Sequence, residues 1–357
     1  MGPIVIDARD AYGPQLRGWG RYVRELVRAL QAGAAGGLEI VAVDRGGPGP
    51  EFVFEQLGLP VLLRRRRAAL VHAPNCFLPL ARPCPGVVTI NDLAFEAWPS
   101  DFTPRTRAKF RLVTRLAARS AQRIICPSQA TADDLVARYG ADPGRIRVIP
   151  DAPGLARGAA GTRGATGVAR GAGSAEGPPS YPGAPYVIAV GDLRAKKNLA
   201  ALISAFAAAR RAGAPHELVL AGADGGEQAR LRALADGLPV TFTGYVDDAR
   251  LDALIAGAEL LVHPSLYEGF GLVILEAMAR GTPVLAARAT ALPETGGEAA
   301  AYFEPADGDD FAHQLQRLLA DPERRAALAA AGRERAAAFS WEATARATAA
   351  VYRELLP

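Results

Sequence analysis

Short apolar runs alternate with amphipathic stretches along most of the chain. In the stretches between the runs, apolar residues recur every three or four positions, which is typical of helices packed on one face. The pattern occurs twice and predicts strands at residues 4–6, 39–43, 70–72, 87–90, 123–126 and 147–149, and again at 186–190, 217–221, 240–243, 260–263, 284–286 and 301–303. Strands that alternate with helices favour a parallel sheet with crossover helices, so we expect an α/β fold.

A segment of different composition separates the two halves. Residues 154–184 are rich in Gly, Ala, Ser and Pro and carry scarcely a large apolar side chain, which indicates a linker. The sequence therefore predicts two Rossmann-like domains, at residues 1–153 and 185–340, with a cleft between them. Open parallel sheets bind ligands beyond the carboxyl ends of their strands, so functional residues are expected where the strand ends of the two domains face each other.

Composition narrows the class of protein. The chain has 357 residues, of which 50% are hydrophobic, and this is ample for two domains. No apolar run reaches the roughly 18 residues that span a bilayer, and the first residues predict a strand rather than a signal peptide, so we expect a cytoplasmic protein. The three Cys and four His lack metal-ligand spacing, which predicts reduced thiols and no protein-bound metal. The arginine- and alanine-rich composition indicates a bacterial source with a GC-rich genome.

Charge is distributed unevenly. Residues 1–155 carry 21 Lys and Arg against 14 Asp and Glu, whereas residues 185–357 carry 17 against 22. Much of the basic excess lies at residues 64–67 and 105–123, the second of which contains no acid. The basic excess is typical of an ordinary solvated helix face, and the hypothesis kept beside this interpretation is peripheral contact with an anionic membrane surface or a lipid diphosphate acceptor. Nucleic acid is not expected, because the basic stretch lacks interleaved aromatic residues.

Two carboxylates and two glycines lie together around the start of an apolar helix, which we expect to begin near Leu272. Gly269 and Gly271 allow the backbone to approach a ligand closely, and the first N–H groups of the helix suit a diphosphate. Glu276 lies among apolar residues, where a carboxylate needs a partner. Taken singly, Glu268 could cap the helix and Glu276 could be solvated, but the combination favours a nucleotide-sugar site.

The run from Glu268 to Glu276 resembles the E-x7-E motif of the family 4 retaining glycosyltransferases, which have the GT-B fold. Further segments resemble this family in the same order along nearly the whole chain: Gly18-Trp19-Gly20-Arg21-Tyr22, Thr89-Ile90-Asn91-Asp92-Leu93, Ile125-Cys126-Pro127-Ser128, Val148-Ile149-Pro150, Lys196-Lys197-Asn198-Leu199, Phe242-Thr243-Gly244-Tyr245-Val246 and Gly281-Thr282-Pro283-Val284. The resemblance implies an acceptor-binding N-terminal domain, a nucleotide-sugar-binding C-terminal domain, and a last helix over residues 341–357 that packs back on the N-terminal domain.

The resemblance also implies roles for individual residues. Glu268 is expected to contact hydroxyls of the donor sugar, Lys197 the diphosphate and Glu276 the ribose. The remaining donor-site residues implied by the family are Gly269, Phe270, Gly271 and Leu272 near the sugar and phosphate, Tyr245 near the nucleobase, and Gly20 and Arg21 in the cleft. The pattern is most similar to mannosyltransferase-like members, which implies GDP-mannose as the first donor to consider. The acceptor would be a glycan, a lipid-linked glycan or a small metabolite, and no cofactor is implied.

Two positions depart from the pattern of the family. Asp192 lies where an arginine is usual, so Arg194 or Lys196 is expected to replace that charge. Asn91 replaces the histidine that commonly precedes Asp92, and an amide can bond a hydroxyl but cannot take a proton. In front-face attack the leaving phosphate helps to deprotonate the acceptor, so transfer is still expected. Asp92 is then either a carboxylate on the acceptor side or a cap of the following turn.

These departures keep other functions open. A non-catalytic nucleotide-sugar-binding protein would retain the same donor residues, and a nucleotide-sugar epimerase or a phosphorylase could share the two-domain architecture. The acid and base set of an epimerase and the phosphate and pyridoxal sites of a phosphorylase are not found. His72, which ends another predicted strand, is either a cleft residue or a buried structural histidine.

Overall fold

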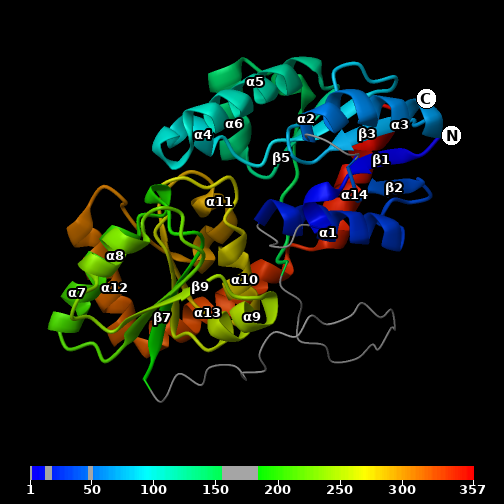
Figure 1. Cartoon of the computed structure of the whole chain (residues 1–357). Helices are drawn as coiled ribbons and strands as arrows, with labels where there is room; N and C mark the ends of the chain where they lie inside the picture. Colours follow the sequence, from blue (N-terminus) through cyan, green and yellow to red (C-terminus); the bar gives the residue numbers. More distant parts are fainter. Residues whose placement is uncertain (1, 13–17, 47–50, 155–183) are drawn as a thin grey trace, which may run out of the picture.

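The computed structural model describes residues 2–12, 18–46, 51–154 and 184–357. They form two α/β lobes that lie side by side, each built on a six-stranded sheet (Figure 1). All pairings in both sheets are parallel. The predicted α/β class is confirmed, and every predicted strand is present to within one residue at each end.

The sheet of the first lobe has the order β2-β1-β3-β4-β5-β6. Its strands are β1 (Ile4–Asp7), β2 (Ile40–Val43), β3 (Leu70–Ala73), β4 (Gly86–Thr89), β5 (Arg123–Cys126) and β6 (Ile146–Val148). Alternate side chains enter two cores, because Ile4 and Ile6 pack on one face and Val5 on the other. The sheet is therefore covered on both faces, as a parallel sheet requires.

Two helices of the first lobe begin at side chains that cap them. Thr103 accepts from the N–H of Thr106 and Ser128 from that of Thr131 at two of the helix starts. The helices are α1 (Gly18–Ala29), α2 (Glu51–Val53), α3 (Leu59–Arg66), α4 (Ala94–Ala97), α5 (Pro104–Ser120) and α6 (Gln129–Tyr139), with short 3₁₀ or π turns at Arg9–Tyr12, Leu30–Ala34, Phe54–Gly58, Pro99–Asp101 and Pro143–Arg145. Gly18 and Gly20 lie inside the first turn of α1 rather than in a loop before it.

The second lobe repeats the architecture, with the strand order β12-β11-β10-β7-β8-β9. Its strands are β7 (Tyr186–Val190), β8 (Glu217–Ala221), β9 (Val240–Gly244), β10 (Leu260–His263), β11 (Val284–Ala287) and β12 (Ala301–Phe303). Its helices are α7 (Leu199–Arg211), α8 (Gln228–Leu234), α9 (Asp248–Ala256), α10 (Leu272–Arg280), α11 (Leu292–Gly296), α12 (Gly308–Ala320) and α13 (Pro322–Ala337), with short turns at Ala195–Lys197 and Gly297–Ala299.

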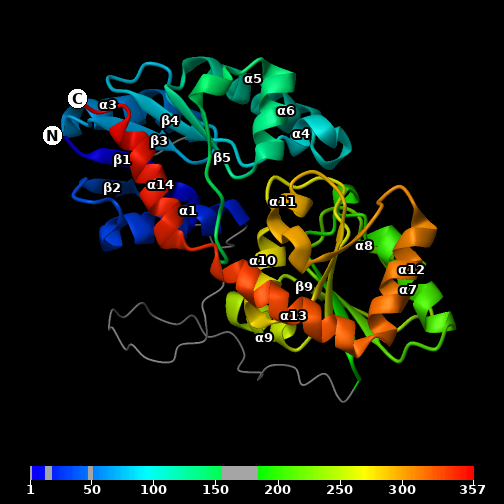
Figure 2. The ribbon, with the colours of Figure 1, turned by 180° about the vertical axis from the view of Figure 1, so that it is seen from behind.

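The last helix, α14 (Trp341–Arg353), returns to the first lobe (Figure 2). Ala345, Ala349 and Tyr352 are buried in the same core as Ile4 and Ile6 of β1. No helix in the described ranges is both long and apolar enough to span a bilayer.

His72 belongs to this packing rather than to the cleft. It is fully buried, its Nδ1 lies 2.7 Å from the Tyr352 hydroxyl, and its Nε2 lies 2.9 Å from that of Thr89. Burial lowers its pKa to about 3, so it stays neutral. The cleft alternative for His72 was therefore wrong.

Of the proposed linker, residues 155–183 lie outside the described part of the chain.

Candidate functional site

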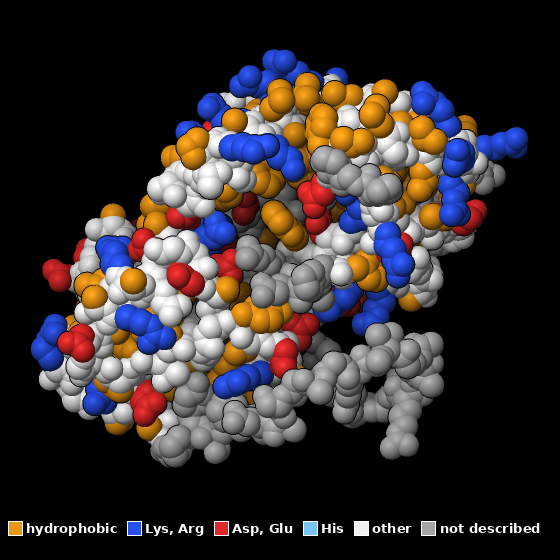
Figure 3. Space-filling view, viewed as in Figure 1, with side chains coloured by type: hydrophobic (Ala, Val, Ile, Leu, Met, Phe, Trp, Pro, Cys, Tyr) orange, Lys and Arg blue, Asp and Glu red, His pale blue; other side chains and the backbone are white. Residues whose placement is uncertain are grey.

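A cavity of about 440 Å³ lies between the two lobes, at the carboxyl ends of both sheets. Figure 3 shows the hollow between the lobes, with charged and hydrophobic side chains around it. Of the residues expected at the site, those that line the cavity are Arg21, Asn91, Asp92, Arg194, Lys196, Lys197, Tyr245, Glu268, Gly269, Phe270, Gly271, Leu272 and Glu276. Gly20 does not line it, because this residue is buried within α1.

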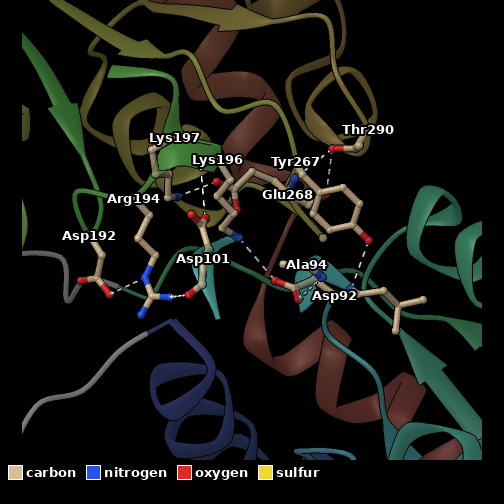
Figure 4. Close-up of polar contacts among 12 residues, drawn as sticks. Asp92, Ala94, Asp101, Asp192, Arg194, Lys196, Lys197, Tyr267, Glu268 and Thr290 are labelled. Atoms are coloured by element: carbon tan, nitrogen blue, oxygen red, sulfur yellow. Dashed lines mark hydrogen bonds and ion pairs between the residues drawn. The ribbon is translucent and has the colours of Figure 1, made fainter. Parts of the chain in front are cut away.

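Lys197 and Glu268 form an ion pair at the centre of the site (Figure 4). Lys197 Nζ lies 2.5 Å from Glu268 Oε1, and both side chains are largely buried. Gly191 makes this geometry possible, because its φ is +139° and a Cβ there would lie 2.9 Å from Cε of Lys197. Burial alone would raise the pKa of the Glu268 carboxyl, but the charges of Lys197 and Lys196 outweigh it and hold that pKa well below its ordinary value. Glu268 is therefore an ionised hydrogen-bond acceptor.

Lys196 supplies a second positive charge beside this pair. Its Nζ lies 3.7 Å from Asp92 Oδ2 of the first lobe, and its backbone N–H donates to Asp101 Oδ2 at 3.3 Å. Burial lowers the pKa of Lys196, but Glu268, Asp92 and Asp101 together raise it above its ordinary value. Arg194 donates to the Asp101 carbonyl at 2.9 Å (Figure 4). Both basic residues that were expected to replace the arginine therefore line the cavity and also bridge the lobes.

Glu276 is 1% exposed, and the partner that its burial demands comes from the other lobe. Arg21 Nη1 lies 3.7 Å from Glu276 Oε1, and Arg21 Nη2 lies 2.5 Å from Asp248 Oδ1 at the start of α9. The second oxygen of Glu276, Oε2, has no hydrogen-bond partner among the described residues. Burial raises the pKa of Glu276 to about 7 in spite of the charges of Arg21 and Arg280.

The loop that leads into α10 is held by the first lobe. Ser128 Oγ and Thr131 Oγ1 donate to the Gly269 carbonyl at 2.6 and 3.1 Å. A Cβ at Gly269 would lie 1.8 Å from the Asn91 carbonyl oxygen, so only glycine fits between the lobes here. Gly271 has a φ of +97° and precedes α10, which begins at Leu272 as expected.

At the wall of the cavity formed by the first lobe, Asp92 caps a turn, as one of its two alternatives from the sequence expected. Its Oδ1 accepts from the Ala94 N–H at 3.0 Å, which caps the turn, while Oδ2 faces Lys196. The Asn91 side chain donates to the Pro74 carbonyl at 3.1 Å. Tyr245 lies at the mouth of the cavity and is 44% exposed.

Two buried residues at this site were not identified from the sequence. Asp151 follows β6, is 5% exposed, and has an Oδ1 without a partner among the described residues; burial raises its pKa to about 7. His263 ends β10, and its Nε2 lies 3.4 Å from Glu268 Oε1. Burial lowers the pKa of His263. Each is a polar residue at the carboxyl end of an apolar run, which is the signal that could have identified them.

This arrangement suits an anionic ligand that carries hydroxyl groups. Lys196, Lys197 and the first N–H groups of α10 provide positive potential at one wall of the cavity. The ionised Glu268 and the free oxygen of Glu276 are acceptors for hydroxyls. Among the described residues, no group of three or more His, Cys, Asp and Glu side chains is arranged to hold a metal ion.

Comparison with known proteins finds two glycosyltransferase family models that match this chain, one in each half. Residues 175–335 match the model "Glycosyl transferases group 1", and residues 49–152 match the model "Glycosyltransferase Family 4". The chain is 47% identical over 115 residues to an MMP alpha-(1->4)-mannosyltransferase of Mycolicibacterium hassiacum, covering 31% of this chain and 28% of that protein. It is 35% identical over 249 residues to D-inositol 3-phosphate glycosyltransferase 2 of Catenulispora acidiphila, covering 65% of this chain and 56% of that protein.

The chain thus matches about half or less of the length of these curated relatives. Among solved structures, a sucrose-phosphate synthase from Thermosynechococcus elongatus has the same fold, with a TM-score of 0.75, 24% identity and 99% of each chain covered.

Proposed function

The chain belongs to the family 4 glycosyltransferases, and on this premise we propose that it moves a hexose from a nucleoside-diphosphate sugar to an acceptor hydroxyl. The observation that carries the proposal is the cavity in which the Lys197–Glu268 ion pair and the buried Glu276 line one wall and Asn91 and Asp92 line the other. A donor between these walls has its sugar and phosphates at the meeting point of the lobes.

The donor is held mainly by the second lobe. Lys197 and the N–H groups at the start of α10 bind the diphosphate, with Lys196 and Arg194 close by, so the leaving group is stabilised without a protein-bound metal. Glu268 accepts from hydroxyls of the sugar, because its low pKa keeps it ionised. Glu276 accepts from the ribose through its free oxygen Oε2. Preorganised donors of this kind contribute about 3–4 kcal/mol each when charge develops on a leaving oxygen.

The reaction retains the configuration of the sugar. The bond between the anomeric carbon and the diphosphate oxygen breaks, with its electron pair going to that oxygen. The acceptor oxygen bonds to the same face of the carbon and gives its proton to the departing diphosphate. This route needs no base at Asn91, and the approach of the lobes excludes water that would hydrolyse the donor.

GDP-mannose is the first donor to test, and a mannosyltransferase among the relatives supports mannose as the sugar. The test measures thermal stabilisation and nucleoside-diphosphate release with GDP-mannose, UDP-glucose, UDP-N-acetylglucosamine and dTDP-rhamnose. At 100 times Kd, a donor stabilises the native state by about 2.7 kcal/mol. We expect one donor to stabilise the protein and to be turned over slowly, and we expect both effects to be lost in Glu276→Ala.

Glu323→Ala is the matched control, because Glu323 is exposed on α13. It should leave both effects intact. No stabilisation by any nucleotide sugar would contradict the donor site.

A non-catalytic nucleotide-sugar-binding protein is the second candidate, and the amide of Asn91 in place of an acid–base group favours it. Such a protein would be stabilised by one donor but would release no nucleoside diphosphate, even with a pool of acceptors. Release that depends on an added acceptor would exclude it.

A further inference from the structure

The end of the cavity in the first lobe is lined by three phenylalanines, which we call the aromatic recess: Phe95, Phe102 and Phe110. Phe110 stacks on Phe95, with ring centroids 5.6 Å apart and an interplanar angle of 21°. It also meets Phe102 edge-on at 6.4 Å. Phe102 and Phe110 are only half-buried, so the recess presents aromatic surface to the cavity.

The polar side chains beside the recess are already engaged. Asn75 donates to Asp10 at 2.7 Å and accepts from the Phe77 N–H at 3.3 Å. Thr114 is 1% exposed and hydrogen-bonds the Cys76 thiol. A sugar in the recess would therefore find little to bond.

The part of the cavity wall around Glu276, α1 and the residues after β6 has the opposite character. Buried polar atoms without a hydrogen-bond partner in the described structure lie there, namely Nε of Arg21, Oδ1 of Asp151 and Oε2 of Glu276. The cavity is thus divided into an end that requires a polar ligand and an end that offers apolar contact.

The recess begins where the proposed reaction takes place. Asp92 leads into α4, which carries Phe95, and α5 carries Phe110. The Arg194 guanidinium lies 5.8 Å from the centre of the Phe102 ring, so the wall of the recess continues into the donor end. A molecule that places a hydroxyl beside Asp92 has its next atoms against these rings.

We propose that the acceptor carries an apolar group that lies in the aromatic recess while its hydroxyl reaches the Asp92 end of the cavity. This inference rests on the proposed function and names the acceptor class of the same site. Burial of each CH2 group against the rings strengthens binding, since apolar surface leaves water.

Two sources could supply this chemistry, namely a membrane lipid and a soluble glycoside with an alkyl or aryl group. The outer face of α5 bears on the choice. Leu112 on this helix is 59% exposed, and the same helix contains no acid and six cations, namely Arg105, Arg107, Lys109, Arg111, Arg115 and Arg119. Two of the six, Arg107 and Arg111, pair with Glu96 of α4. An exposed apolar residue among cations suits an anionic lipid surface.

The test compares octyl and methyl α-D-mannopyranoside as acceptors, with the octyl compound below its micellar concentration. We expect the KM of the octyl acceptor to be lower by on the order of 50-fold, as for burial of about three CH2 groups. In Phe110→Ala the ratio of the two KM values should fall toward one. Leu112→Ala, two residues along the same helix but exposed, should keep the wild-type ratio. Phe102→Ala repeats the test if Phe110→Ala does not fold.

A direct binding measurement separates failure of this inference from failure of the proposed function. Saturation-transfer NMR should detect the octyl chain in contact with the wild-type protein and much less in Phe110→Ala, whether or not transfer occurs. Two results would contradict a role of the aromatic recess in acceptor binding: donor turnover with equal KM values for the two acceptors, or an NMR signal that Phe110→Ala does not change. Neither result would contradict the proposed transferase function. Contact of the octyl chain with the protein, without any donor turnover, would support binding in the aromatic recess and would contradict the proposed transferase function.

Vesicles distinguish the two sources. The acceptor is a mannosyl diacylglycerol in phosphatidylcholine vesicles with and without phosphatidylglycerol. A membrane lipid as acceptor predicts transfer that rises with the anionic lipid and falls in Leu112→Glu. A soluble glycoside predicts transfer to octyl mannoside only, and in both cases Phe110→Ala should lower the transfer. Transfer to the vesicle acceptor that is unchanged in Phe110→Ala would count against it.

Discussion

The guanidinium of Arg21 in the first lobe lies 3.7 Å from the carboxylate of Glu276 in the second. Removal of this charge from beside a buried carboxyl should raise the pKa of Glu276 above about 7. If the ribose binds the ionised form, Arg21→Ala should move the pH at which donor affinity is half-maximal upward by about one unit. The measurement is donor Kd against pH by calorimetry. Arg28→Ala, on the same helix and largely exposed, should leave the profile where it is.

The buried carboxyls make stability depend on pH. Burial raises the pKa of Glu276 from 4.5, and that of Asp151 from 3.8, to about 7. Both groups hold their protons more tightly when folded. They therefore cost nothing below about pH 4 and lower the free energy of unfolding as pH rises from about 4 to about 7. At pH 8 the cost should be roughly 3 kcal/mol for Glu276 and roughly 4 kcal/mol for Asp151.

Glu276→Gln and Asp151→Asn should remove part of this loss. Urea unfolding at pH 5 and pH 8 measures it, and we expect the difference between the two pH values to be smaller in each variant than in the wild type. If the free energy of unfolding of a variant changes between pH 5 and pH 8 as much as that of the wild type, the carboxyl is already ionised in the native state over this range.

The ion pair between Lys197 and Glu268 should be needed for transfer. Lys197→Ala removes a charge from the leaving diphosphate and should lower kcat by about 100- to 1,000-fold. Glu268→Gln should lower it as well, because Lys197 loses its partner and the sugar loses an acceptor. Since the two side chains are 2.5 Å apart, the double variant should lose less than the sum of the two effects. Arg230→Ala, exposed on α8, serves as the control, and strictly additive losses would contradict the coupling.

Gly269→Ala should interfere with the approach of the two lobes. The new Cβ would lie 1.8 Å from the Asn91 carbonyl oxygen, so either the loop or the lobe must move. We expect kcat to fall by more than about 100-fold and the radius of gyration from small-angle X-ray scattering to increase. Gly308→Ala is the matched control, because a Cβ there meets nothing within 4 Å. Wild-type kcat in Gly269→Ala would mean that the lobes need not meet at this point.

The hydroxyl of Tyr352 should contribute to the stability of the first lobe. Tyr352→Phe leaves the buried Nδ1 of His72 without its partner at 2.7 Å and should lower the free energy of unfolding by about 1–3 kcal/mol. Urea unfolding measures the change. An unaltered midpoint would mean that His72 finds another partner.

Local patterns account for what could be predicted. Each strand was predicted to within one residue, because most strands of a covered parallel sheet are short runs of mainly apolar residues. The start of α10 followed from Gly271, whose φ of +97° ends the preceding loop. Both signals lie within a few residues of the feature that they predict.

The remaining features depend on contacts between distant residues. A partner for Glu276 was expected, but its identity as Arg21 follows only from how the lobes meet. The sequence associated Gly269 with a ligand, whereas its lack of a side chain admits the backbone of Asn91. The sequence predicted that a glycine is needed at this position, but the reason for it, the backbone of Asn91, belongs to the other lobe. Likewise, His72 ends a strand near the cleft, and only the return of α14 makes it structural.

The position of α14 has a consequence for the order in which the molecule is made. Ala345, Ala349 and Tyr352 complete a core whose other members include Ile4 and Ile6. The first lobe to leave the ribosome therefore cannot reach its native packing until the whole second lobe has followed it. During synthesis the apolar face beside α1 stays uncovered until α14 emerges, so the lobe that is made first is completed last.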